Sequence, residues 1–354
     1  MTSLTINLEK ISKNIEIINN LCSIQGREFV LVSKIVHSDP FILKYLFDRG
    51  LKSIADINKA NLDAINFDIN RTFFLPSLTE IDETVQSYAY VYTSSIEILK
   101  KISELNLNKK MQIIVPIEFG GLREGVPKNE LIEFLKKSLN LRGVEIAGIS
   151  SNFGCISGRK PSIQELNEIV FIAREIQSKL GHKLKIISTG GTILIDYLIK
   201  NSIPKEINQI RIGEAAFFGY NTFRERYVEG FENNGVILAA EIVEIYEKDT
   251  NQNGSYGKNI FGSKIKKSDR FFNCGLRKRA LLNFGVLSSR MNALTPFDKN
   301  ILLLKQSYDT TIVDIADCDN KYVIGSKVCF YSGYDSTAQS MLSRFVEKKI
   351  VTKS

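Results

Sequence analysis

A regular alternation of two kinds of segment, between about residues 28 and 213, constrains the fold more than any other feature of this chain. Short apolar runs rich in β-branched residues alternate with stretches whose apolar residues recur at helical spacing. Eight such units, with a helix after nearly every strand, predict a closed (β/α)8 barrel and favour it over a doubly wound open sheet. The expected strands are Phe29–Ser33, Ser53–Ala55, Thr72–Leu75, Ala89–Tyr92, Gln112–Val115, Glu145–Ile149, Lys185–Ser188 and Gln209–Ile212.

The pattern changes after Gly230. Short β-branched runs separated by turns follow, and helical spacing returns only over Ala338–Val346. We therefore expect the α/β class, with a TIM-type (β/α)8 barrel over residues 1–230 and a smaller all-β C-terminal domain over residues 231–354. The first few residues of the chain are candidates to join the β-domain.

Composition indicates a cytoplasmic protein without a membrane segment. Apolar residues make up 44% of the 354, and no run approaches the roughly 20 apolar residues that a spanning helix needs. The N-terminus lacks a secretory signal, and the five cysteines are scattered without CxxC pairs, which favours reduced thiols over a structural zinc site.

Much of the net charge of +8 lies between Lys258 and Arg290, without the interleaved aromatics of a nucleic-acid module. An anionic small molecule or a partner's acidic surface fits that charge better than nucleic acid.

Lys34 ends the first apolar run, at the end of a barrel strand where such barrels carry their chemistry. An amine there is a candidate nucleophile or base for Schiff-base chemistry. Taken alone, the ordinary explanation is an ammonium that reaches solvent past the strand end. The turn Ser188–Thr192 after the seventh strand has glycines and hydroxyls that suit a phosphate, although plain turn chemistry would also explain it. Pyridoxal phosphate needs both a lysine and a phosphate site, so the pair favours that cofactor.

Several motifs lie in one order along almost the whole chain, from about residue 4 to 348. They are Val32–Lys34, Glu118–Gly125, Ser150–Cys155, Ser188–Thr192, Arg211–Gly219, Arg277–Ala280 and Leu294–Asp298. In this order and spacing they resemble the fold-type III pyridoxal-phosphate enzymes of the alanine racemase group, and most closely the ornithine racemases.

The resemblance implies a role for each matching residue. Lys34 would hold pyridoxal 5′-phosphate as a Schiff base and serve as one racemisation base, and Arg211 would face the pyridine nitrogen. Because a guanidinium keeps its proton, the ring nitrogen would stay unprotonated, which limits transamination. Arg123 would lie beside the cofactor's phenolic oxygen. The other expected cofactor-binding residues are Asn152, Ser188, Gly190, Gly191, Thr192 and Gly213.

Racemisation requires a second acid or base on the opposite face of Cα. Tyr256 lies in a Tyr-Gly context near the place where alanine racemases carry that residue, and Cys155 and His37 are weaker alternatives. Asp309 could pair with a basic substrate side chain.

The expected function is a pyridoxal-phosphate-dependent amino-acid racemase that works by two-base proton exchange at Cα. The resemblance implies a homodimer, in which the β-domain of one subunit covers the barrel of the other. The family's Asp-Ser-Arg becomes Asp56-Ile-Asn-Lys59 here, which leaves a basic substrate such as ornithine and a small one such as alanine both open. A decarboxylase with the same cofactor, and a non-catalytic cofactor-binding relative, are the alternatives.

Overall fold

The chain divides into two compact units in the computed structural model, which describes residues 1–251, 254–255, 257–263, 271–319 and 321–352. One unit is Leu8–Gly235, and the other joins Met1–Asn7 to Val236–Ser354. The chain therefore passes from the first unit to the second after Gly235, and its first seven residues belong with the C-terminal part.

The unit Leu8–Gly235 is built on a closed barrel of eight parallel strands, which confirms the predicted architecture. Each strand pairs with the next, and the last closes on the first through pairs such as Val30 with Arg211. The strands are β2 (Glu28–Val32), β3 (Ser53–Asp56), β4 (Asn70–Phe74), β5 (Tyr90–Tyr92), β6 (Met111–Pro116), β7 (Val144–Asn152), β8 (Ile186–Gly190) and β9 (Gln209–Ile212).

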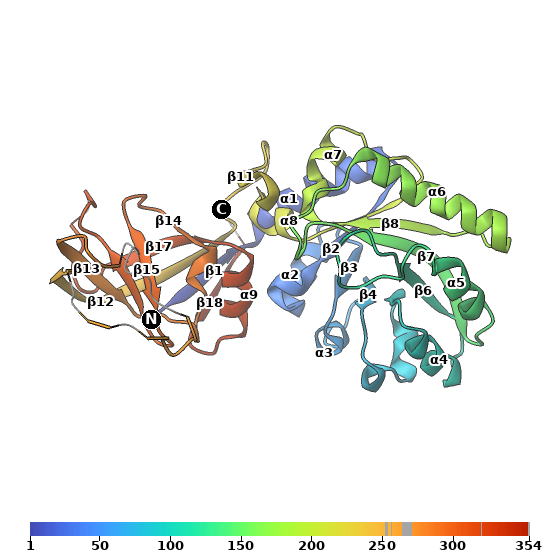
Figure 1. The fold of residues 1–354 in the computed structure, drawn as a ribbon, viewed down its shortest axis with the longest axis horizontal. Coiled ribbons are helices and arrows are strands. Elements are labelled where there is room, and N and C mark those ends of the chain that lie inside the picture. The colour runs from blue at the N-terminus through green and yellow to red at the C-terminus, as the bar shows by residue number, and fades with distance from the viewer. Residues whose placement is uncertain (252–253, 256, 264–270, 320, 353–354) are drawn as a thin grey trace. The chain divides into compact units, whose positions relative to one another are not determined.

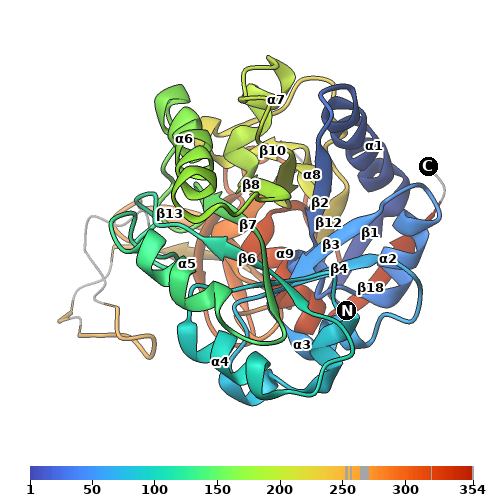
Figure 2. The ribbon, with the colours of Figure 1, turned by 90° about the vertical axis from the view of Figure 1, so that its right-hand side faces the viewer.

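Helices lie outside these strands, as Figure 2 shows. The longest, α6, begins with a capping box between Ser162 and Glu165, ends at Gly181 in the left-handed conformation, and buries one apolar face. The helices of this unit are α1 (Leu8–Ile24), α2 (Pro40–Phe47), α3 (Lys59–Asp63), α4 (Ile96–Glu104), α5 (Leu131–Leu139), α6 (Ile163–Leu180), α7 (Ile195–Ile199) and α8 (Glu214–Phe218).

Residues 77–87 form two short 3-10 turns rather than one helix. Asp82 accepts from the Thr84 N–H and so caps the second turn, which separates it from the first. A hairpin of β10 (Tyr220–Asn221) and β11 (Arg226–Tyr227) follows α8. The 3-10 turns are η1 (Ser33–Val36), η2 (Leu78–Glu80), η3 (Glu83–Ser87), η4 (Thr192–Leu194), η5 (Thr222–Arg224) and, in the other unit, η6 (Met291–Ala293).

The second unit is a mainly antiparallel β-domain, and its described residues include the helix α9 (Tyr334–Leu342). Its main strand order is β14-β17-β12-β13-β16-β15. The N-terminal strand β1, blue in Figure 1, pairs with β12 and with β18, so both ends of the chain complete this sheet. The strands are β1 (Ser3–Asn7), β12 (Val236–Asp249), β13 (Leu276–Leu282), β14 (Leu294–Pro296), β15 (Leu302–Gln306), β16 (Thr311–Asp314), β17 (Lys327–Ser332) and β18 (Glu347–Val351).

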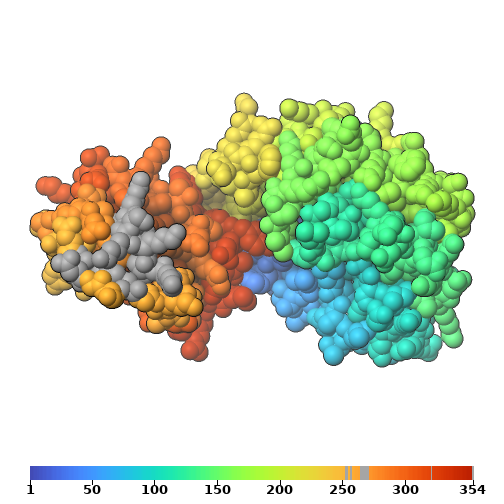
Figure 3. All heavy atoms as spheres, viewed as in Figure 1, coloured from blue at the N-terminus to red at the C-terminus, as the bar shows by residue number. Residues whose placement is uncertain are grey.

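Side chains fill the spaces that the ribbons leave between the elements of each unit (Figure 3). Strands β3 and β9 are buried at every residue, as expected for a parallel barrel covered by helices. Among the residues described, no helix is both long enough and apolar enough to cross a membrane.

Candidate active site

Lys34 lies just beyond the end of the first barrel strand. Strand β2 ends at Val32, and Lys34 belongs to the 3-10 turn η1, whereas the sequence pattern continued the strand to Ser33. His37 and Ser38 then adopt left-handed conformations, with φ of 51° and 47°, which turn the chain toward α2. Lys34 is half-buried, and its ammonium has no hydrogen-bond or ion-pair partner within the described parts of the chain. The amine is thus held at the barrel mouth without a competing carboxylate.

A buried hydrogen-bond network fixes the turn that carries Lys34. The hydroxyls of Ser33 and Ser38 lie 2.7 Å apart, and Ser38 donates to Asp56 Oδ2 at 2.5 Å. Asp56, at the end of β3, also accepts from the backbone N–H groups of Ile57 and Asn58 at 2.6 and 3.0 Å. Asp56 therefore ties the Lys34 turn to the neighbouring strand.

Replacing Asp56 by alanine is expected to lower the free energy of unfolding by about 2–3 kcal/mol, because several buried donors lose their acceptor. Urea denaturation measures this loss. Asp48→Ala is the matched control, because its carboxylate is 49% exposed and pairs only with Lys44 in the same helix region; it should cost less than about 0.5 kcal/mol. Equal losses in the two variants would show that Asp56 does not anchor the turn.

Arg211 lies on β9 and is only 4% exposed. It donates from Nη2 to the Ser151 carbonyl at 2.7 Å and from Nη1 to Ser188 Oγ at 2.5 Å. Its guanidinium lies over Gly190, where an added Cβ would come within 2.6 Å of Nη2. Burial lowers the pKa of Arg211, and the nearby Tyr92 and Glu124 act against that effect. Gly190 is thus required for close packing of the guanidinium.

The Ser188 hydroxyl forms hydrogen bonds to two side chains inside the barrel. Its hydroxyl accepts from Arg211 and donates to Gln209 Oε1 at 2.7 Å, and Gln209 in turn donates to Glu28 at 2.9 Å. The Ser188 hydroxyl therefore helps to hold Arg211, and its expected part in binding the cofactor stays a prediction.

The turns after β8 and β9 meet beside the end of β2. Gly191 has φ of 120°, and an added Cβ would lie 2.2 Å from the Phe153 carbonyl oxygen. Thr192 Oγ1 accepts from the Ala215 N–H at 3.1 Å, which joins the two turns. A Cβ at Gly213 would approach the Val32 carbonyl oxygen to 3.0 Å. The expected phosphate residues Gly191, Thr192 and Gly213 are therefore brought together, close to the strand that leads into Lys34.

Arg123, in the loop after β6, and Asn152, the last residue of β7, meet at Glu124. Arg123 pairs with both Glu124 carboxylate oxygens and donates to Cys155 Sγ at 3.3 Å, and Asn152 Nδ2 donates to Glu124 Oε1 at 3.1 Å. Burial acts to raise the pKa of Glu124, but the bonds and charge of Arg123, with help from Asn152, outweigh it and hold that pKa below its usual range. Glu124 was not singled out from the sequence, although it directly follows the predicted Arg123.

The remaining candidates differ in where they lie in the chain. Tyr256 lies outside the described residues. Asp309 is exposed in the turn between β15 and β16 of the β-domain unit. His37 and Cys155 do belong to loops at the C-terminal ends of barrel strands, next to the Lys34 turn and Arg123 respectively.

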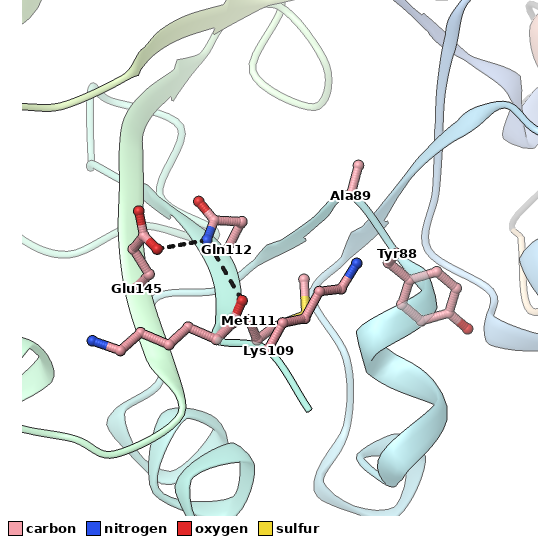
Figure 4. A pocket seen from close by; sticks show the side chains of 7 residues that line it. Tyr88, Ala89, Lys109, Met111, Gln112 and Glu145 are labelled. Carbon is pink, nitrogen blue, oxygen red and sulfur yellow. Dashed lines mark hydrogen bonds between the residues drawn. The ribbon is translucent and has the colours of Figure 1, made fainter. Parts of the chain in front are cut away.

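The larger of the two described cavities, about 300 Å³, lies at the N-terminal ends of the barrel strands, away from Lys34 and Arg211. Figure 4 shows it beside the starts of β5, β6 and β7, where Gln112 donates to Glu145. The chemistry of such barrels occurs at the C-terminal ends of the strands, so this cavity belongs to the structural face. A second cleft, lined in part by Arg123, Glu124, Asn152 and Cys155, lies at the catalytic end.

Comparison with known proteins agrees with this arrangement. The family model described as the N-terminal domain of alanine racemase matches residues 6–221. The chain is 31% identical to the lysine racemase of Thermotoga maritima, over 98% of this chain and 97% of that protein. It is 30% identical to the ornithine racemase of Acetoanaerobium sticklandii, over 98% of this chain and 99% of that protein.

Solved structures share the fold at low sequence identity. An alanine racemase from Clostridium difficile 630 matches with a TM-score of 0.71 at 16% identity, covering 99% of this chain and 96% of its own. A D-threonine aldolase from Filomicrobium marinum matches with a TM-score of 0.68 at 16% identity, over 95% and 88% of the two chains. Together with the family model and the two curated relatives, this identifies the chain as a member of the alanine racemase family, the fold-type III enzymes that racemise amino acids with pyridoxal phosphate.

Proposed function

We propose that this protein racemises a basic amino acid, lysine or ornithine, with pyridoxal 5′-phosphate bound at the C-terminal mouth of the barrel. The names of the two curated relatives support the substrate class. The observation that carries the site is the half-buried Lys34, which lies beyond β2 next to the strand that bears the buried Arg211.

The residues present fit that cofactor. Gly190 leaves room for the buried Arg211 guanidinium, and Gly191 gives the turn after β8 its φ of 120°, which few other residues adopt. Arg211 is buried, and no carboxylate in the described part of the chain accepts a hydrogen bond from it, so N–H donors remain for a ring nitrogen. Bound pyridoxal phosphate would withdraw electrons from the substrate's Cα and make its proton acidic.

Each residue then has a definite task. Lys34 Nζ would hold the cofactor and would move the Cα proton on one face of the substrate. The N–H groups around Gly191, Thr192 and Gly213 would bind the phosphate. Arg123, held by Glu124, would lie beside the phenolic oxygen with Asn152 next to it. Arg211 would face the ring nitrogen and keep its own proton.

The second base acts on the other face of Cα. Tyr256 is our first candidate, and Cys155 and His37 are the alternatives already at the barrel mouth. Cys155 is exposed and accepts a hydrogen bond from Arg123. Because Arg123 fixes the Cys155 sulfur at 3.3 Å beside the expected cofactor site, Cys155 is the better of the two alternatives.

The substrate test follows incubation of single enantiomers in deuterated water with added pyridoxal phosphate. We expect L-lysine or L-ornithine to lose optical activity and to gain deuterium at Cα, at least about tenfold faster than L-alanine. Racemisation confined to alanine would contradict the substrate class. Release of CO₂ in place of exchange would favour the decarboxylase, and stable cofactor binding without exchange on any amino acid would favour a non-catalytic relative.

We also propose that the protein is a homodimer in which the β-domain of one subunit covers the other's barrel mouth. Exposed apolar side chains on the mouth loops support this, since such residues mark surfaces that another chain covers. Leu122 and Ile156 are 90% and 74% exposed, and Ile57 and Leu78 follow neighbouring strands. Asp309 of the covering domain would then meet the substrate's side-chain ammonium.

Changing Leu122 and Ile156 together to aspartate is expected to shift the protein from dimer to monomer and to lower racemisation at least about tenfold, because the charges oppose burial. Sedimentation velocity measures the mass. Phe171→Asp is the control, because this side chain is 65% exposed on the outer helix α6. A fully active monomer would overturn the proposal.

The cysteines bear on where the protein works. None of the five cysteines, all of them in the described part of the chain, forms a disulfide, which suits the reducing cytoplasm. We propose a cytoplasmic enzyme.

A further inference from the structure

A polar layer crosses the barrel interior beneath the mouth. Ser150 on β7 is in register with Ser188 on β8, so both hydroxyls lie on the face that holds Arg211. Tyr92 ends β5, which is the fourth strand of the eight-stranded ring, whereas Arg211 is on the eighth. These strands lie on opposite walls, so the contact between Tyr92 and Arg211 spans the interior.

That contact is a ring-to-guanidinium stack. The Arg211 Cζ atom lies 4.9 Å from the centroid of the Tyr92 ring. Phe74 packs edge-on against the same ring, with the two ring centroids 5.0 Å apart, and so helps to fix the ring. The hydrogen bonds to Ser151 and Ser188 hold two N–H groups of the guanidinium, and the aromatic face supports its plane. A desolvated stack of this kind is stronger than an exposed one.

The Tyr92 hydroxyl adds little to this arrangement. Tyr92 is 4% exposed, and within the described residues its Oη has no hydrogen-bond partner; the same holds for Ser150 Oγ. Burial raises the pKa of Tyr92, so the phenol is neutral at physiological pH. The charge of Arg211 acts against that rise, and so do the nearby Ser150 and Ser188 hydroxyls, although neither hydroxyl meets Oη with hydrogen-bond geometry. The ring is therefore the part of Tyr92 that packs against the guanidinium, whereas the hydroxyl makes no hydrogen bond to it in the described residues.

We propose that Tyr92 is a positioning residue whose ring holds the Arg211 guanidinium in the orientation that faces the cofactor's ring nitrogen. The inference rests on the proposed role of Arg211. A guanidinium that keeps its proton leaves the ring nitrogen unprotonated. A displaced guanidinium would let that nitrogen take a proton, and more turnovers would end in transamination. In that side reaction the substrate leaves as the 2-oxo acid, while its amino group and two electrons stay on the cofactor as pyridoxamine phosphate.

Three variants separate the ring from the hydroxyl and from simple loss of packing. Tyr92→Leu removes the ring, and Tyr92→Phe removes only the hydroxyl. Phe73→Leu removes a fully buried ring on the adjacent strand β4, where Phe73 packs against Tyr88. The measurements are the 2-oxo acid formed per racemisation event, the pH dependence of the bound cofactor's visible absorption, and the melting temperature of the cofactor-free protein.

We expect Tyr92→Leu to raise the 2-oxo acid per racemisation event about tenfold and to make the absorption band depend on pH. Tyr92→Phe should stay within about twofold of the parent and melt at the same or a higher temperature, because an unpaired buried hydroxyl is removed. Phe73→Leu should lower the melting temperature, as Tyr92→Leu should, but should keep the parent's yield of 2-oxo acid per racemisation event.

Two results would overturn this inference and leave the proposed function intact. One is a Tyr92→Leu variant with the parent's yield of 2-oxo acid per racemisation event and the parent's absorption spectrum. The other is a Tyr92→Phe variant whose yield and spectrum change as much as those of Tyr92→Leu. A parent protein that takes up no pyridoxal phosphate would overturn the proposed function, and this inference with it. The parent's own spectrum therefore distinguishes the two failures before any variant is compared.

Discussion

Replacing Lys34 by alanine should lower the racemisation rate by at least about 10³-fold, the largest effect we expect from any single change. The substitution removes the amine that we propose holds the cofactor and also moves the Cα proton. It leaves the turn in place, because Ser33, Ser38 and Asp56 supply the hydrogen bonds that fix it. Circular dichroism spectropolarimetry or chiral chromatography of lysine or ornithine measures the rate.

Lys44→Ala is the matched control for Lys34→Ala. Lys44 belongs to the next helix, α2, and is 50% exposed. Within the described residues its contacts, an ion pair with Asp48 and the Phe47 ring, stay in the same segment. The control should keep the parent's rate and melting temperature. A Lys34→Ala variant that retains a tenth of the parent's rate, with cofactor still bound, would contradict the role proposed for this lysine.

The second large effect concerns Gly191. An alanine there would need a φ near 120° and would place its Cβ 2.2 Å from the Phe153 carbonyl oxygen. Strain and overlap together should lower the free energy of unfolding by about 3 kcal/mol or more. Because the turn must shift, the affinity for pyridoxal phosphate should fall at least about tenfold. Urea denaturation and a cofactor titration measure the two losses.

Gly181→Ala controls for the backbone strain alone. Gly181 ends α6 with φ of 63°, and nothing lies within 4 Å of an added Cβ. Gly181→Ala should lower the free energy of unfolding by about 1 kcal/mol and leave the affinity for the cofactor unchanged. If Gly191→Ala bound the cofactor as tightly as Gly181→Ala, the turn after β8 would not be the phosphate site.

The barrel could be predicted from the sequence because each of its strands and helices is marked by a pattern within its own residues. Buried parallel strands are short apolar runs, and the helices between them carry their own period and caps, as Ser162 and Gly181 do for α6. Strands β1 and β18 could not be predicted in the same way. The sequence Glu347–Val351 is largely charged and pairs with a strand from the other end of the chain, so no local pattern marks it.

The candidate site shows the same division. Lys34, Arg211 and the glycines of the turn after β8 follow from position along the chain, because barrel chemistry lies at strand ends. The roles of Tyr92 and Asp56 could not be predicted from position along the chain, because they depend on contacts across the barrel or between neighbouring strands. The contact between the Ser188 hydroxyl and Arg211 could not be predicted either, because it depends on the alternation along β8 and on its pairing with β9.

The most direct test of the central claim maps the residue that holds the cofactor. Purified protein is loaded with pyridoxal phosphate, treated with borohydride to fix the cofactor to its lysine, and digested for mass spectrometry. We predict that the added mass lies on the peptide that contains Lys34, and that Lys34→Ala carries none. Modification of any other lysine in its place would contradict the site described here.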